Sequence, residues 1–129
     1  MTRVPRAEPS WSEYAAARKW PIAAELHPSR GHGSSEYLVE VRVAPEALSA
    51  YRDLVPGTGL PKGARVAAAH RERSGGQVAS TFVMQKGEDG RWAYFSVGPT
   101  GRVDRGDTAL CRRCHSQAPA DSLFGPPRN

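Results

Sequence analysis

Two cysteines three residues apart, followed at once by a histidine, constrain this chain more than any other feature. The segment Cys111-Arg112-Arg113-Cys114-His115 lies close to the C-terminus. On a helical turn, residues i, i+3 and i+4 share one face, so two sulfurs and one imidazole can point at the same flat ligand. This is the attachment pattern of a c-type haem, in which the sulfurs bond to the macrocycle and the imidazole binds iron. The motif predicts one covalent haem c per chain, with His115 as the proximal iron ligand.

Three other chemistries use the same residue types. A tetrahedral zinc site would add another histidine to the motif, but His27, His32 and His70 are scattered far upstream. A thioredoxin-like redox pair expects a βαβ setting, whereas few residues follow Cys114 and several of them are prolines. A disulfide within the motif would close too short a loop to stabilise the fold much. Haem attachment is therefore the favoured interpretation.

Length and charge limit the remaining possibilities. With 129 residues the chain is expected to form a single domain over 1–129, with an irregular arm at 1–9 and a sheet core over 27–126. The net charge of +5 comes from basic residues spread along the sequence, which does not favour nucleic-acid binding but suits an acidic redox partner. No apolar stretch is long enough to span a membrane.

The N-terminal residues also bear on location. They lack the apolar region of a signal peptide. Since bacteria attach c-type haem outside the cytoplasm, we expect a periplasmic protein whose export signal is missing from this sequence.

The pattern of apolar residues predicts a sheet of consecutive strands. Alternation of apolar and polar side chains predicts strands at 37–43, 65–73, 78–86 and 91–97, with a short edge near 102–103. Helices are predicted at 11–19 and 45–54, a loop at 27–35, a hairpin turn at 74–76, and an Asp107-Thr108 cap before the cysteines. The predicted fold class is α+β, an antiparallel β-meander with short helices packed on it and a C-terminal haem-attachment turn.

Several short motifs occur in a fixed order along this predicted fold. They are His32-Gly33, Pro61-Lys62-Gly63, Val83-Met84-Gln85-Lys86, Gly90-Arg91-Trp92, the attachment motif, and Asp121-Ser122-Leu123-Phe124. In this order they resemble the β-sheet cytochromes that comprise cytochrome P-460 and cytochrome c′-β. The resemblance covers about three-quarters of the chain. Ordinary c-type cytochromes are helical and carry the motif near the start, so their fold is not expected here.

The resemblance implies a five-coordinate haem whose face opposite His115 is open to a small ligand such as nitric oxide or carbon monoxide. In the hydroxylamine-oxidising branch, a lysine on the strand after the Pro-x-Gly turn is cross-linked to the macrocycle, and a nearby carboxylate handles protons. Here that strand reads Ala67-Ala68-Ala69-His70, and the three lysines, Lys19, Lys62 and Lys86, lie elsewhere. This departure favours the c′-β branch, whose open face is lined by apolar and aromatic side chains.

Four residues are candidates for that open face. Phe82 and Phe95 are aromatic candidates, although both also suit an ordinary core. His70 would bind iron as a sixth ligand or hydrogen-bond a bound ligand if its strand face looks at the haem, and is otherwise a surface or hydrogen-bonded histidine. Met84 is a further candidate iron ligand, although a methionine on the apolar face of a strand usually serves core packing.

Three functions follow from these alternatives. A gas-binding haem protein needs an apolar open face and takes a small gaseous or nitrogen-oxide ligand. An electron carrier needs a second axial ligand, His70 or Met84, and a redox partner protein. An enzyme oxidising hydroxylamine needs a carboxylate beside the iron, for which Glu72 and Asp104 are candidates. A homodimer formed through an exposed sheet edge is compatible with each.

Overall fold

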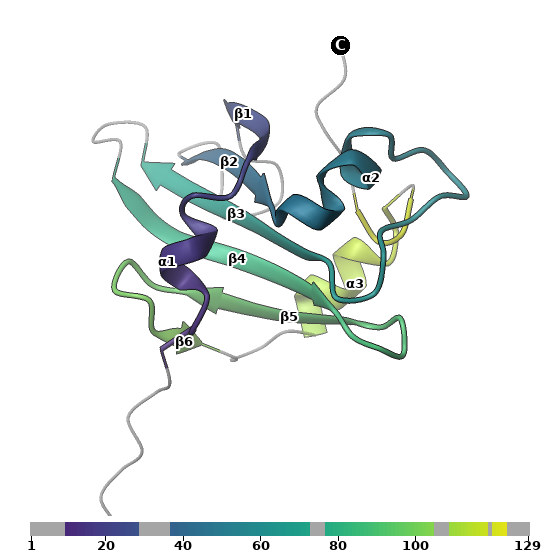
Figure 1. Cartoon of the computed structure of the whole chain (residues 1–129). Coiled ribbons are helices and arrows are strands. Elements are labelled where there is room, and N and C mark those ends of the chain that lie inside the picture. Colours follow the sequence, from purple (N-terminus) through teal and green to yellow (C-terminus); the bar gives the residue numbers. More distant parts are fainter. Residues whose placement is uncertain (1–9, 29–36, 73–76, 105–108, 119, 124–129) are drawn as a thin grey trace, which may run out of the picture.

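Six consecutive strands form one antiparallel sheet, and their order in space is their order in the chain (Figure 1). A computed structural model describes residues 10–28, 37–72, 77–104, 109–118 and 120–123. The strands are β1 (Ile22–Pro28), β2 (Tyr37–Val43), β3 (Arg65–Glu72), β4 (Val78–Lys86), β5 (Trp92–Val97) and β6 (Val103–Asp104). The predicted α+β class and antiparallel meander are confirmed.

Several sequence predictions concern residues outside the described part of the chain. These are the arm at 1–9, the His32-Gly33 motif, the hairpin turn at 74–76, the Asp107-Thr108 cap and Phe124. They stay predictions.

The central strands form where side chains alternate between two faces of the sheet. In one row of the ladder, Val43 pairs with Val66, Val66 with Met84, and Met84 with Tyr94, and all four side chains are buried. Val83 points to the other face and is 1% exposed. Both faces of the sheet are therefore covered along part of their length.

Strand β1 corrects the start of the predicted loop at 27–35, because residues 27 and 28 belong to the strand, while 29–35 lie outside the described residues and stay a prediction. The structure extends a strand through Ile22–Pro28 and pairs it with β2. Two register shifts interrupt this pairing, between Ile22 and Ala24 and between Ala24 and His27. Bulges break the two-residue alternation, so the sequence pattern did not reveal the strand.

The helices are short. The helix α1 (Tyr14–Ala17) is shorter than the predicted 11–19. The predicted helix at 45–54 is a 3-10 turn at Pro45–Ala47 followed by α2 (Leu48–Arg52). The cysteine segment, predicted as a helical turn, forms the helix α3 (Ala109–His115). No helix in the described ranges has the length and hydropathy needed to cross a membrane.

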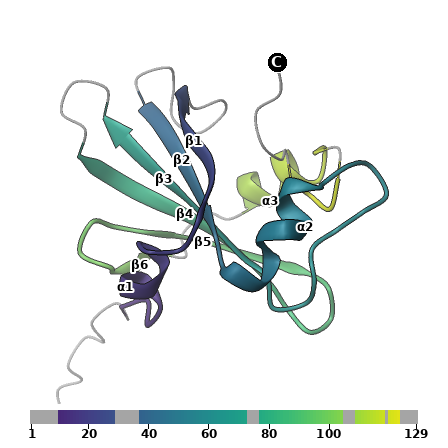
Figure 2. The same ribbon diagram turned by 45° about the horizontal axis from the view of Figure 1, so that its top comes forward.

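Helix α1 covers one face of the sheet, and helices α2 and α3 cover the opposite face (Figure 2). On the α1 face, Trp11, Trp20 and Phe95 form a core with Val83 and Val97. On the α3 face, residues of α2, β4, β5 and the segment 120–123 form a second core, into which Tyr51, Met84, Trp92, Tyr94 and Leu123 are buried. The attachment motif thus lies against the second of these faces.

Candidate functional site

Helix α3 brings Cys111 and His115 of the motif to the core beside strand β5. The Arg112 guanidinium donates to the Trp92 carbonyl at 3.3 Å and lies 5.3 Å from the centre of the Tyr94 ring. Cys111 is partly buried against the core, whereas Cys114 is exposed, and both are thiols in the structure. The contacts made by Arg112 fix which side of the helix faces the sheet.

The His115 imidazole is held on two sides. Its ring centre lies 5.6 Å from that of Tyr94, and its Nδ1 lies 2.8 Å from the Ser122 carbonyl oxygen. Because a carbonyl oxygen only accepts hydrogen bonds, this contact assigns the proton to Nδ1. The lone pair is then on Nε2, the usual arrangement of a metal-binding histidine.

The Ser122 carbonyl belongs to a tight turn between Ala120 and Leu123. The Leu123 amide donates to the Ala120 carbonyl at 2.8 Å, and the two central residues, Asp121 and Ser122, have φ of 48° and 58°. Positive φ at both central positions is typical of mirror-image turns and is uncommon for residues with a Cβ. No glycine or asparagine marks this turn at its central positions, and Ser122 was missed as a contact of His115.

The Asp121 carboxylate ties this turn to three distant parts of the chain. Its Oδ2 accepts from the Leu60 amide and from the Lys86 ammonium, each at 2.8 Å. Its Oδ1 accepts from the Trp92 indole at 3.3 Å. Three motifs that sequence analysis noted separately therefore meet here, those containing Lys86, Trp92 and Asp121.

An apolar row on the α3 face is left partly exposed. Val41 pairs with Ala68, and Ala68 pairs with Phe82, in the row next to the buried Val43, Val66 and Met84 row. All three side chains are only partly buried. We call Val41, Ala68 and Phe82 the open strip.

His70 lies at the end of the open strip, on the same face. It is 2% exposed, its ring centre is 4.9 Å from that of Phe82, and its Nδ1 lies 3.2 Å from the Ala68 carbonyl. Burial lowers the pKa of His70, opposed by the hydrogen bond to Ala68, while the nearby His27 lowers it further. His70 is therefore a buried imidazole with a lowered pKa; the surface alternative is wrong, and the hydrogen-bonded alternative is confirmed.

The other predicted residues do not join this group. Phe95 lies on the α1 face, where its ring centre is 5.6 Å from that of Trp11. Met84 is 6% exposed and packed in the core, while Glu72 and Asp104 are exposed. The structure thus brings Phe82 and His70 to the same face as the motif and leaves Phe95 on the other.

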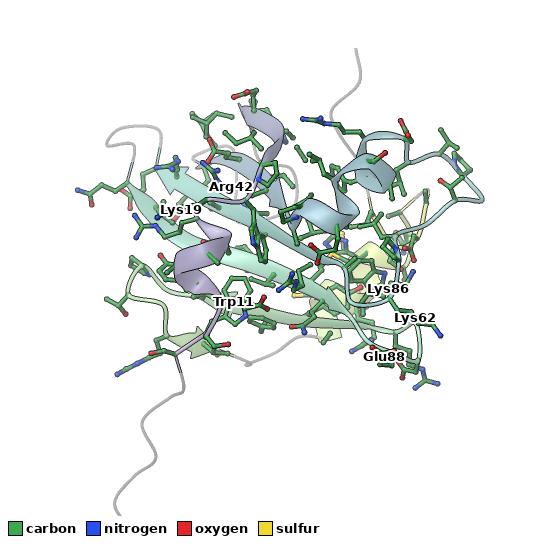
Figure 3. All side chains as sticks on the ribbon, viewed as in Figure 1. Trp11, Lys19, Arg42, Lys62, Lys86 and Glu88 are labelled. Carbon is green, nitrogen blue, oxygen red and sulfur yellow. The ribbon has the colours of Figure 1, made fainter. Side chains whose placement is uncertain are left out.

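Lys62 and Lys86 both lie away from the strand that would carry a cross-linking lysine. Lys62 and Lys86 lie at the same end of the sheet (Figure 3), and Lys62 is exposed in the turn before β3. The Lys86 ammonium, besides its bond to Asp121, donates to the Leu60 carbonyl at 2.9 Å. Neither lysine lies on the strand Arg65–Glu72 that would carry the cross-link.

A separate cavity of about 180 Å³ lies on the α1 face. Charged side chains line part of it, and Glu40 there lies 3.3 Å from Arg42 and 3.8 Å from Arg71. None of the predicted site residues lines this cavity.

The residues of the α3 face fit a c-type haem. The motif's two sulfurs and imidazole share a helix, the His115 lone pair is on the nitrogen that binds metals, and the open strip offers apolar surface to a flat ring. Among the described residues, no three or more His, Cys, Asp or Glu side chains gather in a way that could hold a metal ion. A haem iron takes most of its ligands from the macrocycle and needs only one such side chain.

Comparison with known proteins adds no relative. No protein-family model matches the chain, and no curated protein is significantly similar to it. The resemblance to the β-sheet cytochromes therefore rests on the ordered motifs.

Proposed function

We propose that this chain is a mono-haem c-type cytochrome that binds small gaseous ligands such as nitric oxide or carbon monoxide. The observation that carries the proposal is the His115 imidazole, whose Nδ1 is bonded to the Ser122 carbonyl beside two cysteines on the same helix. A structural zinc site or a simple disulfide gives no reason for the apolar open strip on the adjoining sheet face.

Different residues of the chain would bind the macrocycle, bind the iron and exclude water. Cys111 and Cys114 hold the macrocycle by thioether bonds, and His115 binds iron through Nε2. The group supplies an iron atom with a coordination position for a diatomic gas. Val41 and Phe82 exclude water from that side of the site, while the small side chain of Ala68 leaves room there.

A second candidate is a six-coordinate electron carrier. His70 supports it, because this imidazole lies on the α3 face, is 2% exposed, and carries its proton on Nδ1. A neutral imidazole with its lone pair on Nε2 is suited to bind iron. Two nitrogen ligands would leave no position for a gas.

The hydroxylamine-oxidising alternative has less support. The strand Arg65–Glu72 contains no lysine, and the Lys86 ammonium is bound to Asp121 and Leu60. Of the carboxylates suggested from sequence, Glu72 is exposed at the end of β3. Turnover of hydroxylamine with an electron acceptor would revive this alternative.

The decisive experiment uses chain exported to the periplasm of a bacterium that carries a haem-maturation system. Intact mass shows whether one haem is bound covalently, and the absorption spectrum of the ferrous protein is recorded with and without carbon monoxide. We expect one thioether-bound haem and a spectrum that changes on adding the gas. Chain that carries zinc or a disulfide in place of haem would overturn the proposal.

The variant His70→Leu separates the two candidates. A ferrous wild type that ignores carbon monoxide, paired with a His70→Leu variant that binds it, would establish the six-coordinate carrier. If wild type and variant both bind the gas, His70 does not close the position at which the gas binds, and the gas-binding function stands.

A further inference from the structure

The Asp121 carboxylate lies next in sequence to the residue that fixes the His115 imidazole. Ser122, whose carbonyl accepts from Nδ1, directly follows Asp121 in the Ala120 to Leu123 turn. A displacement of Asp121 therefore moves the acceptor of the histidine. The proposed function itself assigns no role to Asp121 or to its partners.

The turn needs to be held from outside. Both of its central residues have positive φ although both carry a Cβ, a conformation that the backbone adopts at a cost. The hydrogen bond from Leu123 to Ala120 closes the turn from within. From outside, Ser122 contacts His115 and Tyr94, and the Asp121 side chain adds contacts to more distant segments.

Those contacts are charged and largely shielded from water. The Lys86 and Asp121 side chains are 13% and 17% exposed, and their charged atoms are 2.8 Å apart. The same ammonium lies 5.6 Å from the centre of the Trp92 ring, whose indole nitrogen donates to the other carboxylate oxygen. Charge-assisted hydrogen bonds of this kind are stronger than neutral ones and hold a defined geometry.

Gly59 shows how closely the carboxylate is fitted. A Cβ placed on Gly59 would lie 2.9 Å from Asp121 Oδ2 and 3.1 Å from its Cγ. Any residue larger than glycine at this position would push the carboxylate away from Lys86 and Leu60. The position thus offers a way to move Asp121 without altering any charge.

We propose that Asp121, held by Lys86 and Trp92, is a positioning residue that sets the orientation of the His115 imidazole and the strength of its Nδ1 hydrogen bond. This inference rests on the proposed function, because it concerns the bond from His115 to iron. A strong hydrogen bond at Nδ1 makes the imidazole a better electron donor, which strengthens its bond to iron and favours the ferric state.

The test compares three variants of the haem-loaded protein. Asp121→Asn removes the charge from the carboxylate, and Gly59→Ala displaces the carboxylate sterically. Asp53→Asn makes the same charge change at an exposed residue after α2 and serves as the control. The readouts are the iron–histidine stretching frequency of the ferrous protein, the reduction potential, and the melting temperature.

We expect Asp121→Asn and Gly59→Ala to lower the stretching frequency and to make the reduction potential more positive, with Asp53→Asn unchanged from wild type. A purely structural role would lower the melting temperature and leave the frequency and the potential where they are in wild type. That result, in either variant that folds, would overturn this inference and leave the proposed function standing. Wild-type chain without covalent haem would overturn the proposed function, and the inference with it.

Discussion

Two phenylalanines on opposite faces of the sheet are buried to different extents, Phe95 on the α1 face and Phe82 on the α3 face. On the α1 face, Phe95 and Trp11 meet edge to face, and Val83 and Val97 beneath them are almost inaccessible to water. On the α3 face, Phe82 stays partly exposed although it lies on the same strand as Val83. The α1 face is closed around Phe95, and the α3 face is closed where α2 and the segment 120–123 cover it.

This difference supports the α3 face as the ligand face of the proposed function. A folded chain tends to cover its apolar side chains, so a partly exposed apolar row beside reactive residues marks a site. The motif on α3 lies on the face that has such a row. The four predictions below test the contrast between the faces.

The largest effect is expected from the cysteines. The double variant Cys111→Ser and Cys114→Ser should lose covalent haem completely, because thioether bonds need both sulfurs, while the sheet should persist because Cys114 is exposed. Intact mass and circular dichroism measure the two outcomes. Retained covalent haem would show that another residue forms the attachment.

Truncation of the two phenylalanines should affect stability unequally. In haem-free chain, Phe95→Ala should lower the free energy of unfolding by about 3–5 kcal/mol, because it opens a cavity in a closed core. Phe82→Ala should cost clearly less, since the side chain is already partly exposed. Denaturant unfolding compares them, and equal losses would show that the two faces are equally closed.

Neighbouring alanines on β3 allow the opposite experiment. Ala67→Leu should destabilise the fold by about 1–3 kcal/mol, because Ala67 is 4% exposed in the α1-face core. Ala68→Leu enters the open strip and should leave stability nearly unchanged but slow carbon monoxide binding by the haem-loaded protein. Stopped-flow mixing gives the rates. Similar rates in Ala68→Leu and wild type would place the gas elsewhere.

The smallest effect concerns the covered end of the α3 face. Burial raises the pKa of Tyr51 from 10.0 to about 12, so the folded chain keeps a proton that the unfolded chain loses in this interval. The stability that the buried, neutral phenol contributes is fully present below pH 10, the pKa of the phenol in the unfolded chain. It is lost as the pH rises toward about 12, the pKa in the folded chain. Relative to Tyr51→Phe, wild type should lose about 1.4 kcal/mol by about pH 11. If the free energies of unfolding of wild type and Tyr51→Phe fall equally with pH, the Tyr51 phenol is solvated in the folded chain.

Alternation in the sequence was enough to predict β2, β3, β4 and β5, because apolar residues recur at two-residue spacing along each of them. It also placed Val66, Ala68 and His70 on one face. It could not relate Phe82 to Phe95, since the register that sets Phe82 opposite Ser96 depends on the hairpin between them. Side-chain alternation then turns Phe95 to the other face.

The Asp121 contacts were beyond prediction for a different reason. They join residues separated by 61, 35 and 29 positions, and no local pattern reports such distances. The bulged strand β1 was missed because its alternation is broken.

The sequential order of the strands bears on how fast the molecule forms. Each strand pairs with the one before it, so most backbone pairing closes short loops, a topology associated with rapid folding. The bond from Leu60 to Asp121 instead closes a segment of 61 residues. We therefore expect a refolding experiment to show the sheet assembling first, and the Ala120 to Leu123 turn locking last.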